Sequence, residues 1–391
     1  MKAPRFVAIS RAWLRKTIRN NRDIDVSLGG PRIKLSFKQD EPVETRTGID
    51  PSDKSPFYES DPTTLFKYYH GYVNTQEHVD NVLYADVIPI RTGTTNGIAL
   101  NAIRSEDITV AIEASSYRVP EKLRWHADAA VEIFKVMKKL RFLEDKQEWE
   151  NNTSLRVNSI DTTGRLSCQK ARYFDQVGTN ITLDWASGVL ANGWRTIRID
   201  VERPTDGKLR PLQASNLANT LGVAVMLYDK DLSPIVRVRS ESLASIPKRG
   251  LHCTASGVHE VDPTQPPGVF DYSLLERGML KEIKHEIGLD EHEYHLFPIA
   301  FARELPRGGK PQLFYMALAK VENQRIRDAM ATADEAYEYV STDSAEATEM
   351  LGGPELSSDL FTYEGWACLR FAERFVEANT TILRNLCGRD A

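Results

Sequence analysis

Continuous and alternating apolar runs predict the strands of the C-terminal half. Residues 221–229 form an apolar run that ends at Asp229, which is typical of a buried strand. The polar stretch that follows, 229–234, predicts a hairpin turn, and 235–239 then alternates apolar and basic residues like a half-exposed strand. The strands that we expect in this half are 221–229, 235–239, 250–257, 296–303 and 312–321.

Apolar residues at helical spacing predict long amphipathic helices. One begins at Pro120, because proline suits the first helical turn, and its apolar stripe runs from Leu123 to Leu140. Residues 323–333 have helix-forming composition. Residues 364–378 predict a stronger helix, whose apolar stripe consists of Cys368, Phe371, Ala372 and Phe375.

The first half of the chain predicts a separate α+β unit. Residues 32–37 and 107–113 have strand patterns, and 154–160 and 165–169 flank a Thr-Thr-Gly turn like the arms of a hairpin. The stretch 41–62 is rich in Pro, Asp, Glu and Ser and predicts an irregular loop. We expect the segment 173–180 to serve in packing or domain docking, and we assign no individual role to Tyr173 or Asn180. The turn-forming residues 203–208 mark a boundary, so we expect an α+β protein with domains 1–210 and 211–391.

Composition indicates a globular protein. The chain has 391 residues, of which 41% are hydrophobic and 27% charged, so it can bury a sizeable core. No apolar run approaches the roughly 20 residues that a membrane span requires, and the start of the chain has too short an apolar stretch for a secretory signal. The four cysteines lack metal-ligand spacing, so we expect reduced thiols and a cytoplasmic protein.

Charge is unevenly distributed, although the formal net charge is only −5. Basic residues dominate the first 38 positions, which is a feature of some nucleic-acid-binding proteins. Aromatic residues are sparse there, and no groove-binding motif occurs. We therefore expect a solvated basic helix at 8–19 and no nucleic-acid partner.

Residues 281–289 carry the candidate chemistry. Read as a helix, this stretch places Glu282, His285 and Glu286 on one face, because residues three and four apart are neighbours. Gly288 supplies a C-terminal stop. Two carboxylates one turn apart suit a hard divalent cation such as Mg²⁺, which takes its other ligands from water and phosphate oxygens. The alternative is an amphipathic helix with a solvated acidic face.

With its flanking segments, this helix resembles the Nudix hydrolase family. The predicted order is strand, hairpin, strand, glycine, helix, strand and strand, and the resemblance covers roughly residues 216–325. Glu282, Glu286, Gly288 and Leu289 match the family motif, and Lys281 stands where the family has Arg.

The chain also departs from the family at two motif positions. His285 replaces a metal-binding Glu, and Ser273 falls at the upstream Glu position. A Pro- and Gly-rich insertion, 261–268, separates the glycine loop from the helix and reads as a loop.

The resemblance implies a C-terminal α/β/α sandwich with a mixed sheet and a metal centre. Glu282 and Glu286 would be catalytic and hold Mg²⁺ or Mn²⁺, with a further ligand from the carbonyl of Gly257. Lys281 would orient a carboxylate, although a lysine cannot reproduce the bidentate fork of arginine. His285 would either ligate a softer ion such as Mn²⁺ or act as a general base, and the alternative is a surface histidine near a helix C-terminus.

The resemblance also implies residues that meet the substrate. Arg237 and Arg239 point to the same side of their strand and could bind phosphates, the alternative being an exposed sheet face. A general base would come from a loop late in the domain, where the sequence does not choose among Glu335, Glu338, Glu346 and Glu349.

Two functions are therefore expected. The first is metal-dependent hydrolysis of the diphosphate linkage in a nucleoside diphosphate derivative, a small-molecule nucleotide substrate. The alternative is a catalytically inactive nucleotide-binding or regulatory module, which His285 and Ser273 favour. The C-terminal helix, with Trp366 and Phe375, could pack on the sheet or form a homodimer contact.

Overall fold

The structure is a computed structural model of the chain. It describes residues 55–72, 82–88, 105–161, 164–185, 196–203, 206–238, 250–335 and 358–388. It also gives the backbone of four strands: β1 (Asp23–Val26), β2 (Ile33–Ser36), β4 (Arg91–Thr95) and β5 (Ile98–Ala102). The predicted helix at 8–19, most of the predicted loop at 41–62, and Arg239 lie outside the described residues.

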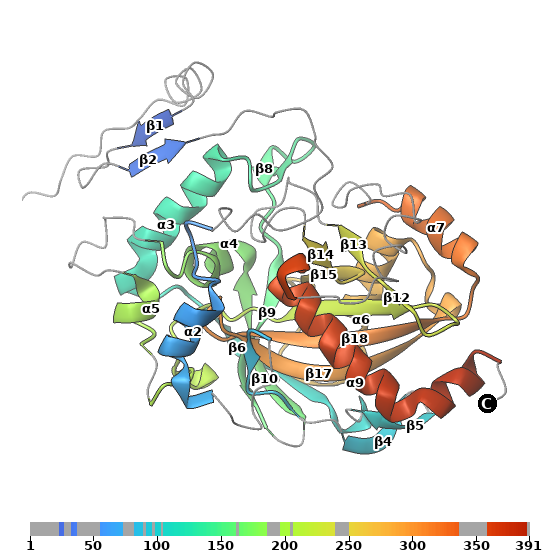
Figure 1. The fold of residues 1–391 in the computed structure, drawn as a ribbon. Helices are drawn as coiled ribbons and strands as arrows, with labels where there is room; N and C mark the ends of the chain where they lie inside the picture. The colour runs from blue at the N-terminus through green and yellow to red at the C-terminus, as the bar shows by residue number, and fades with distance from the viewer. Residues whose placement is uncertain are drawn as a thin grey trace, which may run out of the picture.

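A six-stranded mixed sheet forms the centre of the C-terminal half (Figure 1). Its strand order is β12-β11-β18-β17-β3, and β15 also pairs with β11. The pair β11·β18 is parallel and the other pairs are antiparallel. The bounds are β3 (Tyr84–Ala85), β11 (Gly222–Tyr228), β12 (Pro234–Ile235), β15 (Ala255–Val258), β17 (Tyr294–Glu304) and β18 (Lys310–Ala319).

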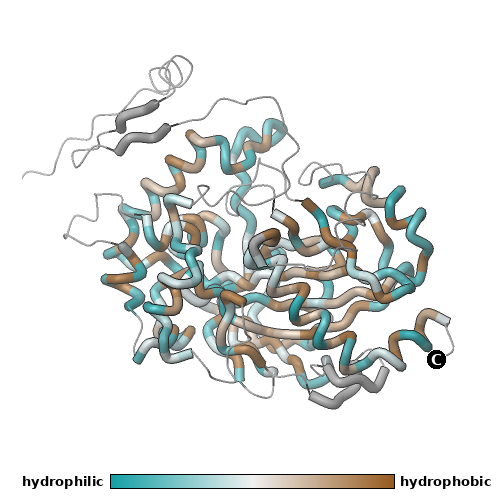
Figure 2. Tube along the Cα trace, viewed as in Figure 1, coloured by the Kyte–Doolittle hydropathy of each residue, from teal (hydrophilic) through white to brown (hydrophobic). Residues whose placement is uncertain are grey.

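Helices cover both faces of this sheet. Along β11, Val223, Val225 and Leu227 belong to one core and Ala224, Met226 and Tyr228 to the other, as the two-residue period of a strand requires. The first core includes apolar residues of α6 (Ser273–Glu282), and the second those of α9 (Tyr363–Leu386). Figure 2 shows the hydrophobic residues along the central strands and the hydrophilic ones on outer helical turns. The α+β fold class is confirmed, with α6 and α9 on opposite faces of the mixed sheet.

A second sheet joins the two halves of the chain. Its order is β16-β6-β10-β9, with bounds β6 (Thr109–Ser116), β9 (Thr153–Ile160), β10 (Arg165–Arg172) and β16 (Gly268–Asp271). The predicted hairpin is confirmed as the antiparallel pair β9·β10. Strand β16, from the second half, pairs with β6 from the first, and β3 pairs with β17 across the same predicted boundary. The division at residue 210 stays a prediction, but strand pairing and a shared core cross it.

The other elements flank these sheets. The helix predicted from Pro120 is α3 (Glu121–Val136), with Pro120 as its N-cap, and the helix at 323–333 is α7 (Asn323–Thr332). In place of the single strand predicted at 235–239, the structure has two short strands, β12 and β13 (Arg237–Val238). The remaining elements are α2 (Pro62–Tyr68), α4 (Tyr173–Gln176), α5 (Ile197–Asp200), β7 (Phe142–Leu143), β8 (Glu148–Trp149), β14 (Leu251–His252), the π-helical segment η3 (Val177–Ile181), and the short 3₁₀ turns η1 (His70–Tyr72), η2 (Ser105–Asp107), η4 (Leu212–Ala214), η6 (Glu291–Glu293) and η8 (Ser358–Leu360).

Buried polar contacts dock the first half onto segments that flank the central strands. Asn180 in η3 donates from Nδ2 to Asn219 Oδ1 at 3.0 Å and to the carbonyl of Arg307 at 2.9 Å. Its Oδ1 accepts from the backbone N–H of Asn219 at 2.9 Å. The packing or docking role predicted for the segment 173–180 agrees with these bonds, which satisfy the buried amide of Asn180.

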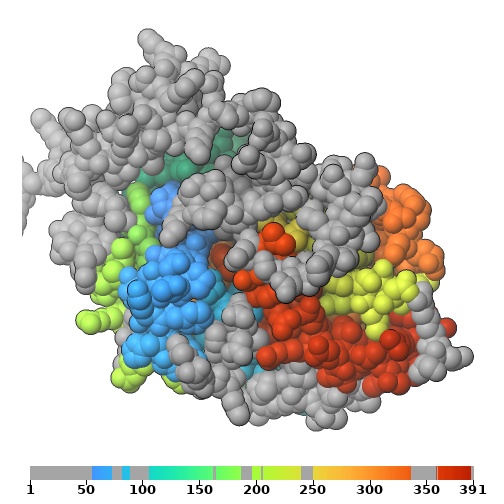
Figure 3. Space-filling model, in the orientation of Figure 1, coloured from blue at the N-terminus to red at the C-terminus, as the bar shows by residue number. Residues whose placement is uncertain are grey.

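The C-terminal helix α9 packs on the sheet. Phe371 and Phe375 contact Phe314 and Phe297, with ring centroids 5.0 and 5.5 Å apart. In Figure 3, α9 (red) crosses the face that also displays the segment 55–72 (blue). All four cysteines are free, and no helix among the described residues is both long and apolar enough to cross a membrane.

Candidate metal centre

The helix that carries the candidate chemistry is longer than the sequence predicted and changes its winding near the end. It begins at Ser273 as α6 and continues as a π-helical turn, η5 (Ile283–Ile287). Met279, Ile283 and Ile287 are buried in the core on the inner side. Gly288 then ends the helix with φ +79°, and a Cβ there would lie 2.7 Å from the Ala329 carbonyl oxygen. Only glycine fits both the left-handed backbone and this close approach.

Three carboxylates converge beside the end of this helix. One oxygen each from Glu282, Glu286 and Glu335 can be chosen so that all lie within 4.8 Å of one another. Glu286 is buried, and the other two are half-buried. Glu335 follows α7, and its backbone N–H donates to the carbonyl of His285 at 2.9 Å, which fixes it beside the π-helical turn. We call these three residues the carboxylate cluster.

The backbone of β15 closes one side of the cluster. The N–H of Ser256 donates to both carboxylate oxygens of Glu286, at 3.2 and 3.4 Å. Next to it, a Cβ on Gly257 would lie 2.5 Å from the carboxyl carbon of Glu282. A side chain at 257 would therefore displace the Glu282 carboxylate from its present position. The carbonyl of Gly257 as a metal ligand stays a prediction.

Crowded negative charge disfavours ionisation of the cluster when no cation is bound. Burial raises the pKa of Glu282 well above its usual range, and the carboxylates of Glu286, Glu335 and Glu260 raise it further, whereas Lys281 lowers it. A divalent cation would relieve this repulsion, since carboxylate oxygens are the ligands that Mg²⁺ and Mn²⁺ prefer. The donor set is therefore suited to the ion that the sequence predicted.

The other predicted site residues lie outside the carboxylate cluster. Lys281 pairs with Glu260, with Nζ 2.5 Å from Oε2. Arg237 is buried and donates from Nη1 to the carbonyl of Glu286 at 2.7 Å, so it supports the helix end. The His285 ring is not part of the carboxylate cluster. The backbone carbonyl of His285 accepts the hydrogen bond from the Glu335 N–H. Ser273 hydrogen-bonds the Asp271 carboxylate from Oγ at 2.5 Å, at the exposed start of α6.

A buried histidine connects the cluster to α9. His252 contacts Ser256 Oγ through Nε2 at 3.0 Å and Thr362 Oγ1 through Nδ1 at 2.5 Å. Thr362 caps α9, because its Oγ1 accepts from the N–H of Gly365 at 3.0 Å. His252 also groups with Cys253 and Glu364 in the core, but both ring nitrogens are already engaged in this chain.

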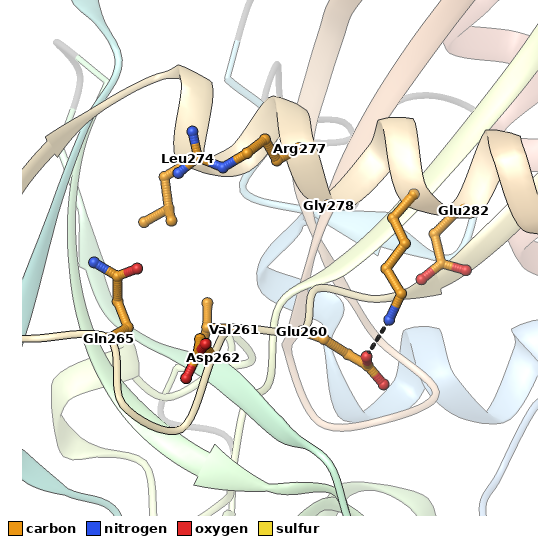
Figure 4. Close-up of a pocket in the computed structure, with 9 residues that line it drawn as sticks. Glu260, Val261, Asp262, Gln265, Leu274, Arg277, Gly278 and Glu282 are labelled. Carbon is orange, nitrogen blue, oxygen red and sulfur yellow. Dashed lines mark hydrogen bonds and ion pairs between the residues drawn. The ribbon is translucent and has the colours of Figure 1, made fainter. Parts of the chain in front are cut away.

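A pocket of about 230 Å³ opens beside Glu282 (Figure 4). Residues of α6 lie along one side, and the segment 260–265 lies opposite. Two hydrogen bonds hold the segment 260–265 against the first half of the chain. Asn152 Nδ2, just before β9, lies 2.5 Å from Glu260 Oε1, and Lys170 Nζ in β10 lies 2.6 Å from the carbonyl of Pro263. The first half of the chain thus supports the edge of the candidate site.

Sequence reasoning missed two features of the site. It did not choose Glu335 among four acidic candidates, of which the other three lie outside the described residues. It also placed β16 in or beside a loop, whereas this strand pairs with β6. Only the strong alternation of residues 107–113 indicated that a sheet in the first half was available for such pairing.

Comparisons with known proteins give little guidance. No protein-family model matches the chain, and no curated protein matches it. Among solved structures, the crystal structure of DR0079 from Deinococcus radiodurans is similar to 34% of this chain and 82% of that chain, with 14% sequence identity and a TM-score of 0.21. A similarity of this size carries no argument about fold or function.

Proposed function

We propose that this protein is a divalent-metal-dependent hydrolase that cleaves the diphosphate linkage of a nucleoside diphosphate derivative. The observation that carries the proposal is the convergence of Glu282, Glu286 and Glu335 against the glycine of β15. The resemblance of this helix and its flanking strands to the Nudix family supports the reaction type.

Three residues would hold the ion, and two others orient them. Glu282, Glu286 and Glu335 would hold Mg²⁺ or Mn²⁺. When bound, the ion would neutralise phosphate oxygens and lower the pKa of water. Ser256 orients Glu286 through its N–H, and Arg237 holds the helix end through the carbonyl of Glu286. Orientation by such surrounding groups is worth about 10- to 100-fold in metal affinity or activity.

A second function is a catalytically inactive nucleotide-binding or regulatory module. Two observations favour it: the His285 ring is not part of the carboxylate cluster, and Ser273 binds Asp271 at the far end of α6. Such a module would bind a nucleotide without hydrolysing it.

Turnover of a substrate panel separates these functions. Nucleoside triphosphates and nucleoside diphosphate derivatives are incubated with Mg²⁺ or Mn²⁺ and the full-length protein, and phosphate-containing products are measured. Glu286→Gln is compared with Glu291→Gln, an exposed glutamate outside the cluster. We expect metal-dependent turnover that Glu286→Gln abolishes and Glu291→Gln retains. Absence of turnover with either metal, together with a nucleotide-induced rise in melting temperature, would favour the binding module.

A further inference from the structure

One strand pair beside the carboxylate cluster holds Glu286 by two routes. In the antiparallel pair β13·β14, Arg237 lies opposite His252. The guanidinium of Arg237 donates to the Glu286 carbonyl at 2.7 Å, so it holds the backbone of this residue directly. His252 acts at one remove: its Nε2 lies 3.0 Å from Ser256 Oγ, and the Ser256 N–H donates to the Glu286 carboxylate at 3.2 and 3.4 Å. The second route therefore runs from His252 through Ser256 to the carboxylate.

The start of α9 fixes the position of His252. The N–H of Thr362 donates to the carbonyl of Leu251 at 2.8 Å, and Thr362 Oγ1 lies 2.5 Å from His252 Nδ1. A Cβ on Gly365 would lie 2.6 Å from His252 Cα, so the first turn of α9 rests on the backbone of β14. His252 and Thr362 have no exposed surface, and water therefore does not compete for these contacts. The imidazole is held at both nitrogens.

Ser256, by contrast, lies on an edge strand. Among the described strands, β15 pairs with β11 alone, and Ser256 lies opposite Ala224 in that pair. The N–H of Ser256 meets the Glu286 carboxylate rather than another strand. An edge strand has strand hydrogen bonds on one side only. The contact of Ser256 Oγ with the fixed imidazole of His252 adds a second restraint on the direction of this N–H.

We propose that His252 is a positioning residue of the metal centre, which keeps the Ser256 N–H directed at the Glu286 carboxylate. This inference rests on the proposed function only in taking the carboxylate cluster as the cation site. Groups that hydrogen-bond a metal-binding side chain fix its orientation, and their removal weakens metal binding. Loss of the contact between His252 and Ser256 therefore weakens cation binding, although the His252 ring does not belong to the carboxylate cluster.

Two substitutions of His252 separate its two contacts. A glutamine amide reaches about as far as Nε2, so His252→Gln can keep the contact with Ser256 and lose the one with Thr362. An asparagine amide reaches only as far as Nδ1, so His252→Asn keeps the contact with Thr362 and loses the one with Ser256. Both variants should unfold at lower urea concentration than wild type, because each loses one buried hydrogen bond.

Mn²⁺ affinity, measured by electron paramagnetic resonance, should distinguish the two variants. We expect His252→Asn to weaken Mn²⁺ binding about fivefold, the effect of roughly one hydrogen bond, and His252→Gln to stay within about twofold of wild type. Ser256→Ala should cause the same loss as His252→Asn, and the double variant should lose no more than either single variant. The control is His126→Asn, at a buried histidine of α3 that contacts Thr182, which should lower stability and keep the affinity.

A purely structural histidine would give a different pattern. Equal affinities in His252→Asn and wild type, equal losses in the Asn and Gln variants, or additive losses in the double variant would each overturn the positioning role.

Failure of the proposed function is a separate result, because the assay measures binding rather than turnover. Mn²⁺ binding without hydrolysis of any substrate would overturn the hydrolase proposal alone, and the affinities of the variants would still decide the role of His252. Absence of Mn²⁺ binding by the wild-type protein would overturn the metal centre and the positioning role together.

Discussion

Gly257 lies so close to the carboxylate of Glu282 that a Cβ at 257 would be 2.5 Å from the carboxyl carbon. The strand β15 and the helix α6 meet here, and a side chain at 257 would displace the Glu282 carboxylate. The acidic helix of the candidate site is therefore packed directly against the backbone of β15 rather than exposed on a solvated face.

Gly257→Ala should weaken Mn²⁺ binding by roughly 10- to 100-fold, because the added methyl group displaces Glu282 from the cluster. The measurement is a Mn²⁺ titration by electron paramagnetic resonance. Gly178→Ala serves as the control, since its Cβ would lie 2.4 Å from Ala127 Cβ in a distant core. It should reduce stability but keep the affinity, and equal affinities for wild type and Gly257→Ala would show that Glu282 is not a ligand.

His285→Ala should leave Mn²⁺ affinity within about twofold of wild type, because the variant keeps the backbone carbonyl that holds Glu335. The same titration checks this result. A large loss of affinity would mean that the imidazole ligates the ion, as the family resemblance implied. His285→Glu restores the family residue, and a rise in its Mg²⁺-supported turnover would identify the histidine as a weakening substitution.

His126 should make the protein less stable in acid. Burial lowers the pKa of this histidine to about 4, and its Nε2 lies 3.2 Å from Thr182 Oγ1. Between pH 6.5 and 4 the unfolded chain binds a proton that the folded chain does not, so stability is complete above pH 6.5 and falls as the pH decreases. The expected contribution is about 3 kcal/mol.

Urea denaturation at several pH values measures this dependence. His126→Gln should flatten the loss of unfolding free energy between pH 6.5 and 4, although His259, whose pKa is also lowered by burial, contributes to the same trend. His292→Gln, at an exposed position, should keep the wild-type dependence. A wild-type dependence in His126→Gln would show that this residue is not the source.

Local patterns were sufficient to predict the central strands. The apolar run 221–229 became β11 because its residues alternate between two cores and both faces of the sheet are covered. The stripe of Cys368, Phe371 and Phe375 likewise predicted the inner face of α9. These features depend on neighbours in the sequence, which is why periodicity reveals them.

Features that depend on distant segments were not predictable. Arg237 was expected to point toward substrate, but the end of η5 covers it and its guanidinium binds the Glu286 carbonyl. Glu335 joins the carboxylate cluster because a turn after α7 is held by the His285 carbonyl, a contact between residues far apart in the chain. The sequence offered several equivalent acids and no physical reason to prefer one.

The central claim is that Glu282, Glu286 and Glu335 bind one divalent cation together. Mn²⁺ titration of Glu335→Gln, monitored by electron paramagnetic resonance, tests it most directly, because Glu335 was selected by the structure alone. Glu286→Gln and the exposed Glu291→Gln accompany it as positive and negative controls. We expect one tight Mn²⁺ site in wild type and Glu291→Gln, weakened by more than about tenfold in both cluster variants. A wild-type affinity in Glu335→Gln, or no Mn²⁺ binding by the wild-type protein, would contradict the account.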